Sequence, residues 1–366
     1  MTKINIWNDK RIVLTLDAGG TNFIFSAIKN GEELVQPIRK PSNSDKLDLC
    51  LKTIKDGFQE VFDLLSEKPV AISFAFPGPA DYRNGIIGNL PNFPAFRGEV
   101  ALGPMLEEHF KIPVFINNDG DLFAYGEALA GFLPTVNTHL EKKNSPKRYR
   151  NLIGLTLGTG IGAGFVHNGI LIEGDNSIAA EVWNIANSIS PDRNLEEGVS
   201  TRAIINQYKS LAHSDENLMP KDIFDIAVNK KEGNQEAALS AFESFGTHLG
   251  DAIANLMMLF DGLVVIGGGL TGASSLYMPA VIKVLKGEFK NKQSRLIHQL
   301  HLWDIASERD IFLESKSKEI KVPYTNKTIH YDPIQKLAIG TSQLGASKAI
   351  SIGAFAYALN QIDQKL

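Results

Sequence analysis

The sequence has little cysteine, with Cys50 the only one in 366 residues. A single thiol excludes an internal disulfide and any zinc site built from several cysteine thiolates. Cys50 itself is expected to be a small buried apolar residue. The sequence also lacks a run of about 18 apolar residues, and its first residues do not pair a basic start with a long apolar core. We therefore expect neither export nor membrane insertion, and a cytoplasmic protein.

An excess of positive charge is missing as well. The 37 Lys and Arg residues against 41 Asp and Glu residues give a net charge of -4, which offers no basic face for nucleic acid. The hydrophobic share of 43% and the charged share of 21% are ordinary for a soluble globular enzyme. A chain of this length exceeds the size that one hydrophobic core usually reaches, so we expect two domains with a cleft between them.

The sequence lacks the common nucleotide-binding motifs. No segment matches the P-loop pattern G-x-x-x-x-G-K-[ST], and GTGIGAG at 158–164 lacks the G-x-G-x-x-G spacing of a dinucleotide fold. If the chain binds a nucleotide, we expect it to use another architecture.

A strand pattern occurs twice along the chain. Residues 11–17 (RIVLTLD) lead into a glycine turn, and 23–29 then run to Asn30-Gly31, a strong hairpin signal. About 140 residues later, 152–157 (LIGLTL) lead into a second glycine turn, followed by AGFVH and Asn168-Gly169. This repeat predicts two similar halves whose glycine turns face one another and share a ligand.

Other segments alternate between helix and strand. Helical spacing of apolar residues predicts helices at 45–66, 238–260 and 343–359, and short apolar runs predict strands at 70–76, 112–116 and 263–269. In the last helix, we expect Gly345 and Gly353 to be tolerated because a neighbour packs closely.

Two segments stand outside this alternation. Residues 134–150 (PTVNTHLEKKNSPKRYR) predict a surface loop, and 286–336, rich in Lys, Gln and Glu, is interpreted as an insertion. The latter carries His298 and His301, which we expect at the surface and without a role.

Three glycine clusters directly follow predicted strands, namely DAGGTN (17–22), GTGIGAG (158–164) and GGG (267–269). Taken singly, each is explained equally well as a tight turn or as a concavity of backbone N–H groups that binds an anion. Three clusters in alternating order favour phosphate binding.

The segment VFINNDGDLF places Asn117, Asn118 and Asp119 where a strand ends and a helix begins. Asn or Asp there is a standard helix N-cap. A carboxylate at a strand end can instead accept a hydroxyl proton during phosphoryl transfer. We favour Asp119 as this base over Asp121, whose place in the first helical turn is explained by the helix dipole.

The segments DAGGTN, NND followed by YGE, LTLGTGIGAG, DGLVVIGGG and QLGASKAISIGAFAYAL stand in the order found in the ROK (Repressor, Open reading frame, Kinase) family. The sequence resembles glucokinase-like members of this family across nearly its whole length. The resemblance implies an α/β, two-lobed, actin-like ATPase fold of the ribonuclease H-like type. It also implies a smaller lobe from 1–120 with 345–366, a larger lobe from 121–344 that includes the insertion 286–336, and a homodimer.

The resemblance further implies ATP-dependent phosphorylation of a hexose or N-acetylhexosamine hydroxyl, with Asp119 as general base. Mg-ATP is expected between the lobes, and Asp17 is expected to orient the Mg²⁺ through water. The implied sugar-binding residues are Gly78, Asn92, Asn118, Glu181, Asn184 and Glu196. The implied ATP-binding residues are Asp17, Gly19, Gly20, Thr21, Asn22, Gly158, Thr159, Gly160, Gly162, Gly267 and Gly268.

The chain departs from the family at its zinc site. Where the family has Glu-x-Gly-His, this sequence has Glu181, Val182, Trp183 and Asn184, and ISPDRN (189–194) replaces the cysteine-rich loop. We therefore expect no zinc. Asn184 can still donate and accept hydrogen bonds. Trp183 is interpreted either as a stacking platform for the sugar or as a core residue, the commoner outcome.

A second function remains open, because the family includes transcriptional repressors. Only sixteen residues precede Asp17, which argues against a helix-turn-helix domain ahead of it. A non-catalytic sugar-binding or sugar-sensing protein is the alternative to an enzyme, and the retention of Asp119 favours the enzyme.

Overall fold

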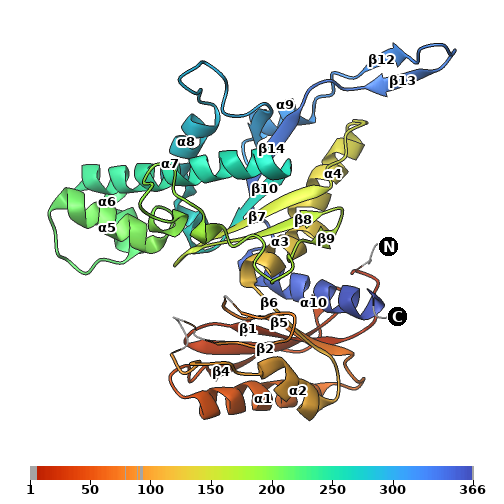
Figure 1. Ribbon diagram of the computed structural model, residues 1–366, viewed down its shortest axis with the longest axis vertical. Coiled ribbons are helices and arrows are strands. Elements are labelled where there is room, and N and C mark those ends of the chain that lie inside the picture. The colour runs from red at the N-terminus through yellow and green to blue at the C-terminus, as the bar shows by residue number, and fades with distance from the viewer. Residues whose placement is uncertain (1–5, 79, 89, 91–93, 365–366) are drawn as a thin grey trace. The chain divides into compact units, whose positions relative to one another are not determined.

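A computed structural model describes residues 6–78, 80–88, 90 and 94–364 (Figure 1). The chain forms two compact units. The first unit gathers Met1–Gly131, Gly164–Ala180 and Leu344–Leu366, and the second consists of Phe132–Ala163 and Glu181–Gln343. The lobe boundaries drawn from the sequence, at 120 and 345, remain a prediction about the functional lobes.

A mixed sheet forms the centre of the first unit. Its strands are β1 (Val13–Ala18), β2 (Asn22–Lys29), β3 (Glu32–Glu33), β4 (Ile38–Pro41), β5 (Ala71–Ala75) and β6 (Val114–Asn117). The strand order is β3-β2-β1-β5-β6, with β4 paired to β2. Strands β1, β5 and β6 run parallel, whereas β2 is antiparallel to β1. Asn30 and Gly31 have φ values of 55° and 73° between β2 and β3, so the predicted hairpin is confirmed.

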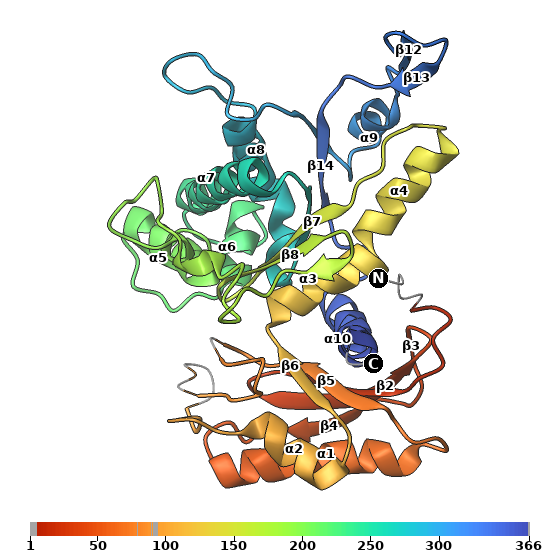
Figure 2. The same ribbon diagram turned by 45° about the vertical axis from the view of Figure 1, so that its right-hand side comes forward.

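Helices cover both faces of this sheet. They are α1 (Leu47–Leu64), α2 (Leu102–Phe110) and α10 (Ala346–Gln364), and α3 (Asp119–Leu129) packs on α10. Figures 1 and 2 show α1 and α2 on one face and α10 on the other. In the core under α1, the rings of Phe25 and Phe58 meet edge to face at 5.2 Å. Gly57 is required there because a Cβ would lie 2.3 Å from the Phe25 ring.

Glycine lets α3 and α10 approach one another closely. A Cβ on Gly353 would lie 1.9 Å from the Leu122 carbonyl oxygen, and a Cβ on Gly126 would lie 1.9 Å from that of Ala349. The close neighbour predicted for Gly353 is therefore confirmed. The expectation that Gly345 lies inside the helix is wrong, because its φ of 80° is a left-handed conformation and the helix begins after it.

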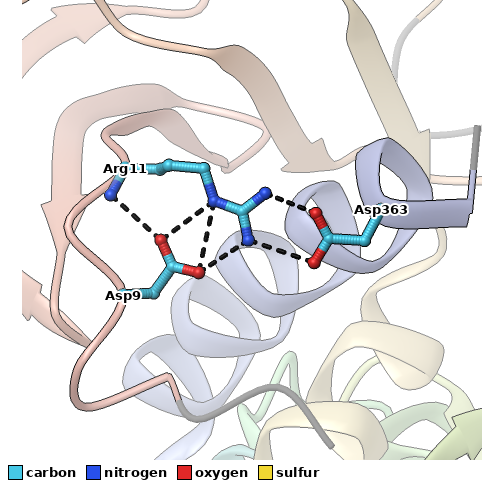
Figure 3. Close-up of polar contacts among 3 residues, drawn as sticks. All are labelled: Asp9, Arg11 and Asp363. Carbon is cyan, nitrogen blue, oxygen red and sulfur yellow. Dashed lines mark hydrogen bonds and ion pairs between the residues drawn. The ribbon is translucent and has the colours of Figure 1, made fainter. Parts of the chain in front are cut away.

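Arg11 ties the segment before β1 to the last turn of α10. Figure 3 shows its guanidinium between the carboxylates of Asp9 and Asp363, at 2.6 and 2.5 Å. Hydrogen bonds from the guanidinium to both carboxylates favour its protonated form and raise the pKa of Arg11. The planar guanidinium pairs with both oxygens of Asp363, so it holds the C-terminal end of α10 against the segment before β1.

The second sheet has the same arrangement of neighbours as the first. Its strands are β7 (Asn151–Leu157), β8 (Ile161–His167), β9 (Ile170–Leu171), β10 (Leu263–Gly267), β11 (Gln299–Leu302) and β14 (Lys336–Thr341). The order is β11-β14-β10-β7-β8-β9, and the chain enters the first unit within β8, at Gly164. In both sheets the hairpin strands lie on one side of the first strand and parallel strands lie on the other. The architectural repeat predicted from the sequence is therefore confirmed at the level of topology.

Helices surround this sheet. They are α4 (Phe132–Lys142), α5 (Thr201–Ala212), α6 (Pro220–Ala227), α7 (Gln235–Phe260), α8 (Ser274–Leu285) and α9 (Ala306–Leu313). Short 3₁₀ turns occur at η1 (Val182–Asn184), η2 (Leu195–Glu197) and η3 (Gly269–Ala273), and β12 (Lys318–Lys321) with β13 (Thr328–Tyr331) forms a separate exposed hairpin. Helix α7 contacts β7, α5, α6 and α8. In the described part of the chain, no helix is long and apolar enough to span a bilayer.

The surface loop predicted at 134–150 is wrong in its first part. Residues 134–142 belong to α4, because Leu133, Val136 and Leu140 bury one helical face. The segment 286–336, whose interpretation as an insertion stays a prediction, contains β11 and the buried Trp303, whose ring meets Phe132 at 5.8 Å.

The expectation that both histidines of this segment lie at the surface is also wrong. His301 is only 6% exposed because β11 pairs with β14, and the His298 side chain is 12% exposed beside Asp261. The pairing of β11 with β14 brings both histidines out of solvent, and no local sequence pattern reveals a pairing between such distant segments.

Candidate active site

The first glycine turn connects β1 and β2. Gly19 must be glycine because a Cβ would lie 2.9 Å from the carbonyl oxygen of Asn22. Ser42 braces the turn, since its hydroxyl donates to the carbonyl oxygen of Gly20 at 2.5 Å and its N–H donates to that of Thr21 at 3.0 Å. Ser42 is buried, and no sequence pattern indicates its role because its partners lie about twenty residues away.

Asn118 and Asp119 have different positions at the end of β6. Asn118 is the N-cap of α3, and its side-chain oxygen accepts the N–H groups of Gly120 at 2.6 Å and Asp121 at 3.4 Å. The capping interpretation is therefore confirmed for Asn118. Asp119 is the first residue of the helix, with an exposed side chain whose oxygen also accepts the Gly120 N–H, at 2.9 Å. Asp121 lies in the first turn and is 5% exposed.

The electrostatic surroundings of Asp119 favour its protonated form. Displacement of water by the surrounding protein raises the pKa of Asp119, and the negative charge of Asp17 raises it further, against the hydrogen bond from Gly120. Solvent still reaches the side chain, so screening moderates this rise. A carboxylate with a raised pKa is a better proton acceptor than an ordinary aspartate.

Three candidate residues share one edge of the first sheet. Asp17 lies at the end of β1, and Gly78 and Asp119 follow β5 and β6, whose carboxyl ends meet that of β1 at this edge. Gly78 lies against Tyr82, since a Cβ would be 2.2 Å from the tyrosine hydroxyl oxygen. Asn92 lies outside the described residues.

A buried polar network supports the strand end before Asp119. Asn117 is 2% exposed, and its side-chain oxygen accepts the Asn118 N–H at 2.7 Å. Its amide nitrogen lies 3.5 Å from a Glu173 oxygen, which also accepts the Tyr357 hydroxyl at 2.5 Å. Burial raises the pKa of Tyr357, and the Glu173 charge adds to this effect. Glu173, which the sequence did not single out, thereby links the end of β6 to α10.

The remaining two glycine clusters come together in the second unit. Strands β7 and β10 are parallel neighbours with Thr156 opposite Gly267, so their carboxyl ends lie side by side. Gly268 has a φ of 93° and packs against the end of β7, where a Cβ would lie 2.4 Å from the Leu157 carbonyl oxygen. The Gly158 N–H donates to the carbonyl oxygen of Gly160 at 3.0 Å, which closes the turn. Thr159 is exposed in this turn, and Gly162 lies in β8.

Glu196 contacts the same turn. A Cβ on Gly160 would lie 2.1 Å from a Glu196 carboxylate oxygen, so glycine is required for this approach. The other Glu196 oxygen lies 3.7 Å from the Arg202 guanidinium, which also pairs with Glu197 at 2.6 Å. One candidate sugar ligand is thus placed directly against a candidate phosphate turn.

Glu181 and Trp183 form a local hydrogen bond at η1. The indole N–H of Trp183 donates to a Glu181 carboxylate oxygen. Trp183 is half-buried, so its interpretation as a core residue is wrong. Its indole N–H is used in the hydrogen bond to Glu181, which keeps that edge of the ring out of the core. Asn184 is exposed.

Metal binding at the described residues concerns zinc and Mg²⁺. Among the residues that the structure describes, no group of three or more His, Cys, Asp or Glu side chains is placed to hold a metal ion. Cys50 is fully buried, as expected, and burial raises the pKa of its thiol to about 11. The half-buried carboxylate of Asp17 at a strand end is the type of hard oxygen donor that suits Mg²⁺ with its water shell.

The sequence matches the model of a known protein family. The model of the ROK family matches residues 13–302. The chain belongs to the ROK family. The structure is also similar to that of a glucokinase from Parabacteroides distasonis, with a TM-score of 0.89 and 48% identity over 98% of this chain and 99% of that one.

Two further relatives, found by sequence similarity, are named as sugar kinases. A glucokinase of Thermotoga maritima is 27% identical over 72% of this chain and 84% of its own length. An N-acetyl-D-glucosamine kinase of Vibrio cholerae is 28% identical over 71% of this chain and 85% of its own length. The resemblance inferred from five sequence motifs and the actin-like ATPase fold are therefore confirmed. These similarities identify the protein as a phosphotransferase of the sugar kinase type.

Proposed function

We propose that this protein transfers the γ-phosphoryl group of ATP to a hydroxyl of a hexose or N-acetylhexosamine. Its relatives named glucokinase and N-acetyl-D-glucosamine kinase support this range of acceptors. The observation that carries the proposal is the position of Asp119, at the carboxyl edge of a sheet beside Asp17 and with a raised pKa.

The glycine turns are proposed to hold the phosphates. Backbone N–H groups of glycine-rich turns bind phosphate oxygens because no Cβ blocks the approach. The ATP-binding set is Asp17, Gly19, Gly20, Thr21, Asn22, Gly158, Thr159, Gly160, Gly162, Gly267 and Gly268. Mg²⁺ bound with ATP would neutralise phosphate charge, and Asp17 would orient it through water.

Asp119 is proposed to act as the general base. The sugar hydroxyl oxygen bonds to the γ-phosphorus, the bond to the ADP oxygen breaks, and the hydroxyl proton passes to the Asp119 carboxylate. In a loose transition state this proton moves late, so in-line positioning and charge neutralisation supply much of the rate.

The sugar is proposed to bind to Gly78, Asn92, Asn118, Glu181, Asn184 and Glu196. Because the Asn118 oxygen already caps α3, its amide nitrogen is the group that would donate to a sugar hydroxyl. The carboxylates of Glu181 and Glu196 would accept hydroxyl protons in hydrogen bonds. We further propose a cytoplasmic homodimer, on the family resemblance alone.

A coupled assay of ADP release tests this function. Glucose, fructose, mannose, allose and the N-acetylhexosamines are each supplied with Mg-ATP to the purified protein. We expect sugar-dependent ADP release with at least one of them, and the ranking names the substrate. Binding of a sugar without ADP release across the whole panel would instead identify a non-catalytic sugar-binding protein.

A further inference from the structure

A loop in the second unit carries a proposed sugar ligand at each end. Glu181 precedes η1 and Glu196 lies within η2, and the chain between them returns on itself. The Leu195 N–H donates to the Ile185 carbonyl oxygen at 2.9 Å, and Ala186 forms a β-bridge with Asn194. The placement of both carboxylates therefore depends on how this loop is held.

Asn187 is the buried centre of the loop. It is 2% exposed, and its side-chain oxygen accepts the backbone N–H groups of Ile189 and Ser190, each at 3.1 Å. Its own N–H donates to the Arg193 carbonyl oxygen at 3.1 Å. Two backbone donors aimed at one atom identify that atom as the oxygen of the amide rather than its nitrogen.

His248 of α7 binds the same oxygen. Its Nδ1 lies 3.0 Å from the Asn187 oxygen, so Nδ1 carries a proton and donates. Burial lowers the pKa of His248, which favours the neutral ring with its proton on Nδ1. Gly198 admits this contact, because a Cβ there would lie 2.6 Å from the imidazole and 2.9 Å from the Asn187 amide nitrogen.

A second contact one turn along α7 fastens the same loop. The Ser188 hydroxyl donates to Asp251, whose other oxygen pairs with Arg295 at 2.5 Å. The tip of the loop contributes little apolar packing, since the side chains of Ile189 and 191–193 are exposed. Hydrogen bonds therefore hold the tip of this loop to the helix, whereas Val182 and Leu195 near its ends are buried.

We propose that Asn187 and His248 are positioning residues for the sugar, which hold the loop so that Glu181 and Glu196 keep their places. This inference rests on the proposed kinase function. Because Glu196 packs against Gly160 in the second phosphate turn, a shift of the loop moves a sugar ligand relative to that turn. The hydrogen bond between Asn187 and His248 thus restrains the loop, as a bound metal or a disulfide restrains loops in other proteins.

The test compares two substitutions of His248. His248→Leu removes the donor, whereas His248→Asn places an amide nitrogen where Nδ1 was. We expect His248→Leu to raise the KM for the sugar about tenfold and to leave the KM for ATP within about twofold, as loss of one buried hydrogen bond predicts. His248→Asn should restore most of the sugar KM. Melting temperatures are measured in parallel, and assays run well below them.

Gly198→Ala provides a second variant if His248→Leu does not fold. It leaves both polar groups in place and pushes the ring from the amide, so the sugar KM should again rise while the ATP KM does not. A folded variant with the sugar KM of the unmodified protein would show that the pair serves stability alone and would overturn the inference. Absence of sugar phosphorylation by the unmodified protein would overturn the proposed function itself, and this inference with it.

Discussion

At the scale of single residues, Asp119 combines solvent access with a raised pKa. Its carboxylate accepts one backbone N–H, feels the charge of Asp17 and is surrounded by protein that displaces water. The two carboxylates repel one another, and a divalent cation near Asp17 would offset part of that repulsion. The charge of Asp119 is therefore expected to change at a higher pH than that of an ordinary aspartate.

The activity should show this dependence. A protonated Asp119 cannot accept the sugar hydroxyl proton, so kcat/KM for the sugar falls as pH drops through the pKa of that group in the free enzyme. Because the pKa is raised from the ordinary value of 3.8, the fall begins at a higher pH than an unperturbed aspartate would give. A pH profile of kcat/KM with saturating Mg-ATP measures it. An acid limb at or below the ordinary value would contradict the assignment.

The sequence predicted some site residues and missed others for a physical reason. Asp119 and the glycine turns were found because their chemistry follows from their place after a strand. Ser42, Glu173 and Asn187 were missed because each acts on a partner that the fold alone brings near. The prediction for Trp183 was wrong because the residue type alone does not show whether a tryptophan packs in a core or uses its indole N–H in a hydrogen bond, as Trp183 does with Glu181.

At the scale of helices and strands, the contact of α3 with α10 positions the start of α3. Gly126 and Gly353 each meet a carbonyl oxygen of the opposite helix, so the two axes lie closer than larger side chains would permit. Arg11 holds the far end of α10 through Asp363 (Figure 3). Asp119 is thus placed by a helix pair rather than by a loop.

Gly353→Ala tests this packing. In an open helix, alanine would add about 1 kcal/mol of stability. Here the new Cβ meets a backbone oxygen at 1.9 Å, so overpacking should win and lower the free energy of unfolding by about 1–3 kcal/mol. Ser347→Ala, at an exposed position of the same helix, is the control and should change stability by less than about 0.5 kcal/mol. Urea unfolding of both variants measures this, and a gain of stability in Gly353→Ala would refute the packing argument.

The elements that the sequence predicted best are those with a strong local signal. The hairpins at Asn30-Gly31 and Asn168-Gly169, the strands before the glycine turns, and the helices α1 and α7 all fall where their patterns indicated. Helix α4 was missed because Pro134 and the basic residues that follow the helix, at 143–150, gave the whole segment the composition of a loop. Strand β11 was missed because its stability comes from parallel pairing with β14, more than thirty residues away in sequence.

At the scale of the whole molecule, two sheets of like topology each carry glycine turns at the carboxyl ends of their strands. One unit contains Asp17, Gly78 and Asp119, and the other contains Glu181, Glu196 and the glycine turns that follow β7 and β10. The sequence could predict this duplication because a strand, a glycine turn and an Asn-Gly hairpin recur in the same order. We propose that the choice of sugar depends on how the side chains of Trp183 and Asn184 are placed, and no sequence pattern determines that placement.

The central claim is that Asp119 takes the proton of the sugar hydroxyl, and Asp119→Asn tests it most directly. Asparagine keeps the oxygen that accepts the Gly120 N–H, so the fold should be retained while the base is lost. With the sugar that gives the fastest ADP release, we expect kcat to fall at least about hundredfold, as removal of a general base predicts. ATP affinity, measured by calorimetry in the same preparation, should stay unchanged. Turnover close to that of the unmodified protein would contradict the account.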